Sequence, residues 1–212
     1  MFDGFLRVAA ATPDIRVADC NFNGASAAAL VSEAYEQGVS LLVLPELCLT
    51  GYTCSDLFLQ ESLLDGAGKA LLTLTEATRD KNMVVLAGLP LTVNGVLYNA
   101  AAVLHDGDIL GFVPKSYLPT YSEFYEGRHY HSGADIETDV LFNGRTYPFG
   151  TRLLFRCRQM PAFTLGIEIC EDLWVAQPPS ISHALAGATV IANLSASDET
   201  TGKDIYRRSL VS

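Results

Sequence analysis

The chain has 212 residues, of which 49% are hydrophobic and 18% charged, and its formal net charge is −10. This composition is typical of a folded globular domain with a substantial core, and we expect residues 1–212 to form one domain. The acidic balance argues against a nucleic-acid partner, whose phosphates require clustered Lys and Arg. We also expect no membrane segment and no signal peptide, because long apolar runs and a cleavage pattern are absent from the sequence.

Five cysteines and four histidines are the candidate soft ligands and nucleophiles of the chain. An odd number of cysteines without metal-like or redox spacing favours reduced thiols in a cytoplasmic protein. The histidines are scattered, and no partner ligands stand at suitable spacings. The sequence therefore predicts neither a metal site nor a disulfide framework.

The first third of the chain alternates between apolar runs and helical periodicity. Residues 5–11 read as a buried strand, and a helical pattern that follows ends at Gly38. The apolar run 41–45 is short enough to be a central strand, whereas residues 56–81 are mostly helical in pattern. Strand and helix alternation of this kind is typical of layered α/β folds.

From residue 83 onward, short strands and tight turns dominate. Asn94-Gly95 predicts a hairpin between 84–93 and 97–104, and Asn143-Gly144 marks another hairpin. A polar, aromatic loop from 116 to about 138 is too long to be a simple connector. Further strands are expected at 109–113, 153–156, 163–169 and 190–194, with a helix at 181–186. The mixture indicates packed layers around a mixed sheet.

Three chemically active side chains each follow an apolar strand. They are Glu46, Lys115 and Cys170. Taken singly, each has an ordinary explanation: a solvated turn glutamate, an exposed lysine and a small core cysteine. Their joint occurrence at strand ends, where functional groups of layered α/β folds gather, favours a common site.

The local patterns around these three residues resemble the signatures of the nitrilase superfamily. The patterns are Pro45-Glu46-Leu47, Pro114-Lys115 and Glu168-Ile169-Cys170-Glu171-Asp172. Further segments are similar to the glutamine amidotransferase domain of glutamine-dependent NAD synthetases. These segments are 49–52, 56–58, 121–128, 170–174 and 193–197.

The resemblance implies an α/β fold, specifically a four-layer α-β-β-α sandwich with two mixed sheets. The chain would be an N-terminal portion of a longer enzyme, lacking the last strands of this domain and the whole synthetase domain. No Ser-Gly-Gly-x-Asp-Ser or Walker-type loop is found in the sequence. ATP and Mg are therefore expected only in the synthetase domain, and no cofactor is expected for the glutaminase step.

The same resemblance implies roles for individual residues. Cys170 would be the nucleophile, Glu46 the general base and then acid, and Lys115 the cation that favours thiolate and oxyanion. Glu126, in the loop after the lysine, would support them. The glutamine pocket would be lined by Tyr52, Tyr121, Glu171, Ser197 and Lys203. Family members commonly have arginine where Lys203 stands, and a lysine lacks the bidentate fork.

The function implied is hydrolysis of the glutamine side-chain amide through a cysteine thioester. The ammonia would serve a synthetase domain that makes NAD from deamido-NAD with ATP. Expected partners are L-glutamine, that domain and further copies of the chain in a homo-oligomer. Two alternatives stay open: a free-standing amidase, carbamoylase or nitrilase of the same superfamily, and a non-catalytic oligomerisation module.

Overall fold

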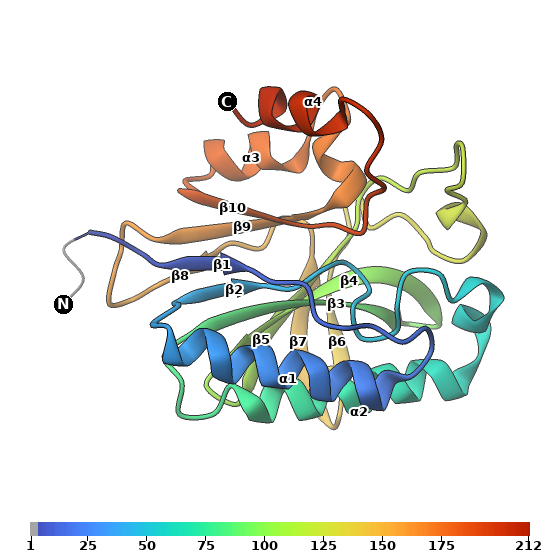
Figure 1. The fold of residues 1–212 in the computed structure, drawn as a ribbon, viewed down its shortest axis with the longest axis horizontal. Helices are drawn as coiled ribbons and strands as arrows, with labels where there is room; N and C mark the ends of the chain where they lie inside the picture. Colours follow the sequence, from blue (N-terminus) through green and yellow to red (C-terminus); the bar gives the residue numbers. More distant parts are fainter. Residues whose placement is uncertain (1–3) are drawn as a thin grey trace.

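Two β-sheets pack face to face, with helices on both outer sides, in the computed structural model, which describes residues 4–212 (Figure 1). In spatial order, the strands of the larger sheet are β1 (Val8–Ala10), β2 (Leu41–Val43), β3 (Val84–Val93), β4 (Val96–His105), β5 (Asp108–Pro114), β7 (Arg145–Gly150) and β6 (Glu137–Phe142). Those of the smaller sheet are β10 (Val190–Leu194), β9 (Thr164–Ile169) and β8 (Phe155–Arg156). The predicted four-layer α-β-β-α sandwich is confirmed.

Both sheets are mixed, as predicted. Strands β1, β2 and β3 run parallel, whereas β3, β4 and β5 form an antiparallel meander. Strand β7 then pairs in parallel with β5 and antiparallel with β6, and in the smaller sheet β9 is parallel to β10 and antiparallel to β8. The turns at Asn94-Gly95 and Asn143-Gly144 have positive φ at both residues, as a two-residue hairpin turn requires.

Helices α1 (Cys20–Glu36) and α2 (Glu61–Ala77) cover the larger sheet, and α3 (Pro179–Leu185) and α4 (Lys203–Leu210) lie beyond the smaller one (Figure 1). Three short 3-10 helices complete the fold: η1 (Ser55–Leu59), η2 (Glu126–Arg128) and η3 (Cys170–Leu173). Glycine lets α1 and α2 approach closely, because a Cβ at Gly24 would lie 2.9 Å from the Cβ of Ala70. Two of these 3-10 helices carry site residues.

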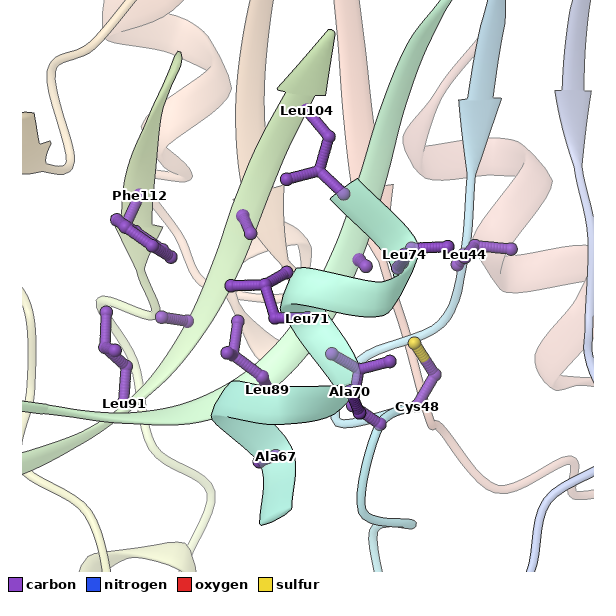
Figure 2. Close-up of a cluster of buried hydrophobic side chains, with 14 of the residues drawn as sticks. Leu44, Cys48, Ala67, Ala70, Leu71, Leu74, Leu89, Leu91, Leu104 and Phe112 are labelled. Atoms are coloured by element: carbon purple, nitrogen blue, oxygen red, sulfur yellow. The ribbon is translucent and has the colours of Figure 1, made fainter. Parts of the chain in front are cut away.

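Helix α2 packs its apolar side onto the larger sheet (Figure 2). Figure 2 shows Leu71 and Leu74 of the helix directed at side chains of the sheet, among them Leu89 and Leu104. A second cluster fills the space between the sheets, with Leu86 and others from the larger sheet against β9 of the smaller sheet. The strands that end at the site are therefore buried on both faces, which holds their ends rigidly.

The structure corrects the expectations at several boundaries. The strand expected at residues 5–11 is only Val8–Ala10, and Val8 is 56% exposed rather than buried. β1 lies at an edge of the sheet and has one neighbouring strand, so one of its flanks is not covered. The helix expected over 56–81 is divided at Gln60, whose extended backbone separates η1 from α2.

Candidate active site

Three chain segments that follow strands bring the predicted catalytic residues together. Glu46 comes three residues after β2, Lys115 directly after β5, and Cys170 directly after β9. All three are buried, and Lys115 has no exposed surface at all. The first two belong to the larger sheet and the third to the smaller sheet, so the site lies where the two sheets meet.

Lys115 binds two carboxylates at once. Its Nζ lies 2.7 Å from Oε1 of Glu46 and 2.7 Å from Oε1 of Glu126, and the three side chains are almost completely buried. The hydroxyl of Tyr52 donates a second hydrogen bond to the same Glu126 oxygen, at 2.6 Å. The structure thus brings Glu46 and Glu126 into contact with Lys115.

The electrostatics of this cluster keep the lysine charged. Burial alone would lower the pKa of Lys115, but the neighbouring Glu46 and Glu126 raise it above its usual range. Burial also raises the pKa of Glu126, against the opposing effect of Lys115, with Glu46 adding to the rise. A charged lysine between two acidic side chains is suited to stabilise further negative charge that develops beside it.

Cys170 is the first residue of η3, directly after β9, and its backbone is strained. Its φ is +46°, a left-handed conformation that is costly for a residue with a side chain, by about 1–3 kcal/mol. Burial, and then Glu46, raise the pKa of its thiol to about 12, while Lys115 and a hydrogen bond from Ser195 act in the opposite direction. The thiol is therefore protonated at rest and requires a base before it can attack.

Two residues that sequence reasoning missed fix the Glu46 carboxylate. Asn99 of β4 donates from Nδ2 to Oε1 at 2.7 Å, and the backbone N–H of Ala196 donates to Oε2 at 3.0 Å. A polar residue inside the apolar run of β4 was the available signal for Asn99, because a buried amide needs a partner. No sequence signal points to a backbone donor 150 residues away from its acceptor.

Asp172 joins the two halves of the site and was likewise not assigned a role. Its buried carboxylate accepts from the backbone N–H of Tyr117 at 2.8 Å, of Ile169 at 3.0 Å and of Ser116 at 3.1 Å. One side chain thus connects the segment after Lys115 to the residue before Cys170. Burial raises its pKa to about 7, although the N–H donors from Ile169 and Tyr117 oppose the rise.

A glycine on β3 lets the backbone of Glu46 pass very close to the sheet. A Cβ at Gly88 would lie 2.2 Å from the nitrogen of Leu47 and 2.6 Å from the Cα of Glu46. The backbone N–H of Gly88 also donates to Pro45, at 3.2 Å, on the same segment. Any side chain at this position would displace the carboxylate from Lys115.

The helix that carries Glu126 is held by an ionic contact on the rim of the site. Arg128 makes two hydrogen bonds to Asp56, at 2.8 and 2.9 Å, and the ring of His129 lies 3.0 Å from the same carboxylate. These contacts join η2 to η1, so the long loop after β5 has a fixed rather than arbitrary course. The expected loop is therefore ordered around its glutamate.

The predicted substrate-binding residues lie in pairs around the same region. Tyr121 donates to Glu171 at 2.9 Å, and Lys203 donates to Ser197 at 2.6 Å and also pairs with Asp198. A cavity of about 320 Å³ adjoins them, and its lining includes Tyr52, Glu126 and Ser197 but not Tyr121, Glu171 or Lys203. Of the five predicted pocket residues, Tyr52 and Ser197 therefore line this cavity and the other three do not.

The described residues hold no metal-like cluster. Among residues 4–212, no group of three or more His, Cys, Asp or Glu side chains is arranged to hold a metal ion. Within that range, no helix combines the length and apolar character needed to cross a membrane.

Comparison with known proteins identifies the family of the chain. The carbon-nitrogen hydrolase family model matches residues 7–208. Proteins named glutamine-dependent NAD(+) synthetase are 46% identical in Mycobacterium tuberculosis over 98% of the chain and 30% of that protein, and 35% identical in Thermotoga maritima over 98% of the chain and 33% of that protein. The chain thus spans about a third of the length of these relatives.

Solved structures of related proteins share the fold of this chain. A glutamine-dependent NAD(+) synthetase from Cytophaga hutchinsonii superimposes with a TM-score of 0.85 at 31% identity, over 97% of this chain and 33% of that one. An amidase from Nesterenkonia sp., at 21% identity and a TM-score of 0.67 over 94% of this chain and 68% of that one, shares the fold. The chain therefore belongs to the carbon-nitrogen hydrolase family.

Proposed function

We propose that this chain hydrolyses the side-chain amide of glutamine through a thioester on Cys170 and supplies the ammonia to a synthetase domain. The observation that carries the proposal is the buried contact of Lys115 with Glu46 and Glu126, beside a cysteine whose backbone is strained. The relatives support the choice of substrate, because their names specify a glutamine-dependent synthetase.

The first half of the reaction forms the thioester. Glu46 accepts the proton of the Cys170 thiol as the sulfur attacks the amide carbon of glutamine. The oxyanion of the tetrahedral intermediate is stabilised by Lys115 and by the backbone N–H of Glu171. Loss of one such donor typically costs about 2.7–4 kcal/mol in the barrier. Glu46 then returns the proton to the leaving nitrogen, and ammonia departs.

The second half releases glutamate. Glu46, again unprotonated, accepts a proton from a water molecule that attacks the thioester carbon, and the same donors stabilise the second oxyanion. The sulfur leaves and recovers a proton from Glu46, which restores the starting state. Lys115 stays protonated throughout, because the two carboxylates that contact it favour its charged form.

Recognition of the amino acid requires a cation for its carboxylate and an acceptor for its ammonium group. Lys203 and Glu171 take these parts in the proposal, with Tyr52, Tyr121 and Ser197 as neighbours. The contact of Tyr121 with Glu171 supports this assignment, because it orients the carboxylate at the edge of the site. Lys203 is a point charge and binds a carboxylate less specifically than a guanidinium.

The wider context follows from the same proposal. The ammonia would reach a synthetase domain that binds ATP and Mg and converts deamido-NAD to NAD. The glutaminase step itself uses no cofactor in this account. We place the protein in the cytoplasm, as a homo-oligomer, and the five free cysteines are compatible with a reducing compartment.

The test is release of ammonia from L-glutamine by this chain, with Cys170→Ala and buffer alone as controls. We expect the wild-type chain to release ammonia from glutamine and the two controls to release none. Asparagine should not replace glutamine as substrate. A silent chain would be followed by a longer protein that includes the synthetase domain. Silence of both would contradict the proposal and favour the non-catalytic oligomerisation module.

One contact favours a second candidate, an amidase, carbamoylase or nitrilase with a different substrate. Lys203 is already paired with Asp198, so its charge is partly neutralised before any carboxylate arrives. An amide without a carboxylate would not need that charge. A screen of glutamine against simple amides, carbamoyl amino acids and nitriles separates the two functions, and preference for simple amides would favour the second.

A further inference from the structure

A serine hydroxyl lies beside the sulfur of Cys170. Ser195 Oγ is 3.4 Å from Sγ, within the range of a hydrogen bond to sulfur. Sheet register explains the contact. Strands β9 and β10 run parallel, with Ile169 opposite Leu194, so the residues that directly follow them, Cys170 and Ser195, end at the same level. The serine is therefore placed by the sheet and not by a chance loop conformation.

The surrounding hydrogen bonds orient the hydroxyl. The backbone N–H of Ser197 donates to Ser195 Oγ at 3.3 Å, which uses one acceptor position of the oxygen. The hydroxyl hydrogen is then free to point at the sulfur. Asn193 Nδ2 also donates to the backbone oxygen of Cys170 at 3.4 Å, which ties the ends of the two strands together.

A second donor to the sulfur is needed because the nearby cation is already engaged. Lys115 contacts both Glu46 and Glu126, so much of its field at the sulfur is offset by these carboxylates. A thiolate in a buried position requires hydrogen bonds to its charged form if it is to be populated. Ser195 is the described side chain with a hydroxyl directed at the sulfur.

We propose that Ser195 is a catalytic residue whose hydroxyl donates a hydrogen bond to Cys170 and stabilises the thiolate as the proton passes to Glu46. No bond to oxygen forms or breaks: the serine keeps its proton, and the sulfur alone attacks the substrate. The inference rests on the proposed role of Cys170 as nucleophile, but the state of the thiol can be measured without glutamine.

The experiment measures alkylation of each cysteine by iodoacetamide between pH 6 and 10, with the products located by peptide mass spectrometry. The variants are Ser195→Ala, which removes the hydroxyl, and Ser195→Thr, which retains it. Ser180→Ala on α3 is the matched control, since it removes a partly buried serine hydroxyl elsewhere. The partly exposed Cys157 serves as an internal reference within each sample.

We expect Ser195→Ala to slow alkylation of Cys170 by about 3- to 10-fold near neutral pH, as loss of one ordinary intramolecular hydrogen bond implies. The slower rate should hold across the whole pH range, because the pKa of the Cys170 thiol, about 12, keeps the thiolate a minor species throughout. Ser195→Thr should restore the rate, and Ser180→Ala should match wild type. Thermal unfolding should be alike in all variants, because Ser195 lies on the surface.

A wild-type alkylation rate in Ser195→Ala would overturn the inference. It would equally be overturned if Ser195→Thr were as slow as Ser195→Ala, because the effect would then not come from the hydroxyl. Neither result depends on turnover of glutamine. A failure of the glutaminase assay with intact thiol behaviour would therefore count against the proposed function alone.

Discussion

The two ends of strand β5 carry ion pairs of nearly equal length in opposite surroundings. Asp108, its first residue, pairs with Arg145 at 2.8 Å, and Lys115, directly after its last residue, pairs with Glu46 at 2.7 Å. The side chains of the first pair are 40% and 64% exposed, whereas those of the second are fully buried. Distance alone therefore says little about energy: water screens the first pair, and the second exists only as a mutually compensated group.

The largest expected effect comes from breaking the buried cluster. Lys115→Met leaves the carboxylates of Glu46 and Glu126 buried without their cation, and we expect a loss of about 3–5 kcal/mol in the free energy of unfolding at pH 8. Urea denaturation measures it. The loss should shrink as the pH falls, because unpaired buried carboxylates have raised pKa values and become neutral.

Lys69→Met is the control for that substitution. Lys69 lies on an exposed face of α2, so its change removes one positive charge without leaving a buried carboxylate unpaired. Lys69→Met should leave the free energy of unfolding near the wild-type value at pH 8 and at lower pH. If Lys115→Met were equally harmless, the buried cluster would not differ energetically from a surface pair.

A smaller effect is expected from substitution of Gly88, which lies against the backbone of Glu46 in the buried cluster. Gly88→Ala forces a Cβ into the backbone of Glu46 and Leu47, and such overpacking costs about 1–3 kcal/mol. Ammonia release from glutamine should fall with stability, because the carboxylate of Glu46 moves away from Lys115. Gly68→Ala in α2 is the matched control, since only an ordinary contact with Phe142 is made there and helix propensity improves. Equal stability of the two variants would contradict this account.

The free energy of unfolding should also depend on pH through Asp172, whose buried carboxylate contacts the segment after Lys115. Its pKa in the folded protein is about 7, above the usual aspartate value, so folding favours the protonated form. The corresponding stability is fully present below about pH 4 and is lost as the pH rises through about 7. Asp172→Asn should flatten this part of the curve in urea denaturation at pH 4–8. An unchanged slope in the variant would show that Asp172 does not titrate in that window.

The smallest effect is expected at the exposed end. Arg145→Ala should barely change the thermal midpoint, because the pair with Asp108 is screened by solvent and costs side-chain entropy to hold. The small change should fade further in 1 M salt. A large, salt-resistant loss would remove the contrast between the two ends of β5.

Much of the fold could be predicted because local chemistry decides it. Strand β3 has the predicted bounds Val84–Val93, since the Asn94-Gly95 turn fixes where the strand ends. Strand β10 also has its predicted bounds, Val190–Leu194. The exposure of β1 could not be predicted, because it depends on which strand flanks it and not on its own residues.

The candidate reactive groups and one residue that supports them, Glu126, could be named from the sequence, whereas the other hydrogen-bond partners could not. Glu46, Lys115 and Cys170 stand in extended sequence patterns, whereas Asn99 and Ser195 act through single contacts between strands distant in sequence. Asn99 and Glu46 are 53 residues apart, and their contact depends on how β4 is placed beside β3 and β2. Such contacts follow from register, which turn chemistry specifies only within each hairpin.

The hydrogen bond from Ala196 to Glu46 also has a consequence for the order of events during folding. It closes a loop of 150 residues, so Glu46, the proposed general base, acquires this partner only after the smaller sheet has docked on the larger one. Contacts of such long sequence separation form slowly. On the ribosome, the α1–α2 side of the larger sheet can fold before residue 196 has been synthesised. We therefore expect the carboxylate of Glu46 to be fully held only late in folding.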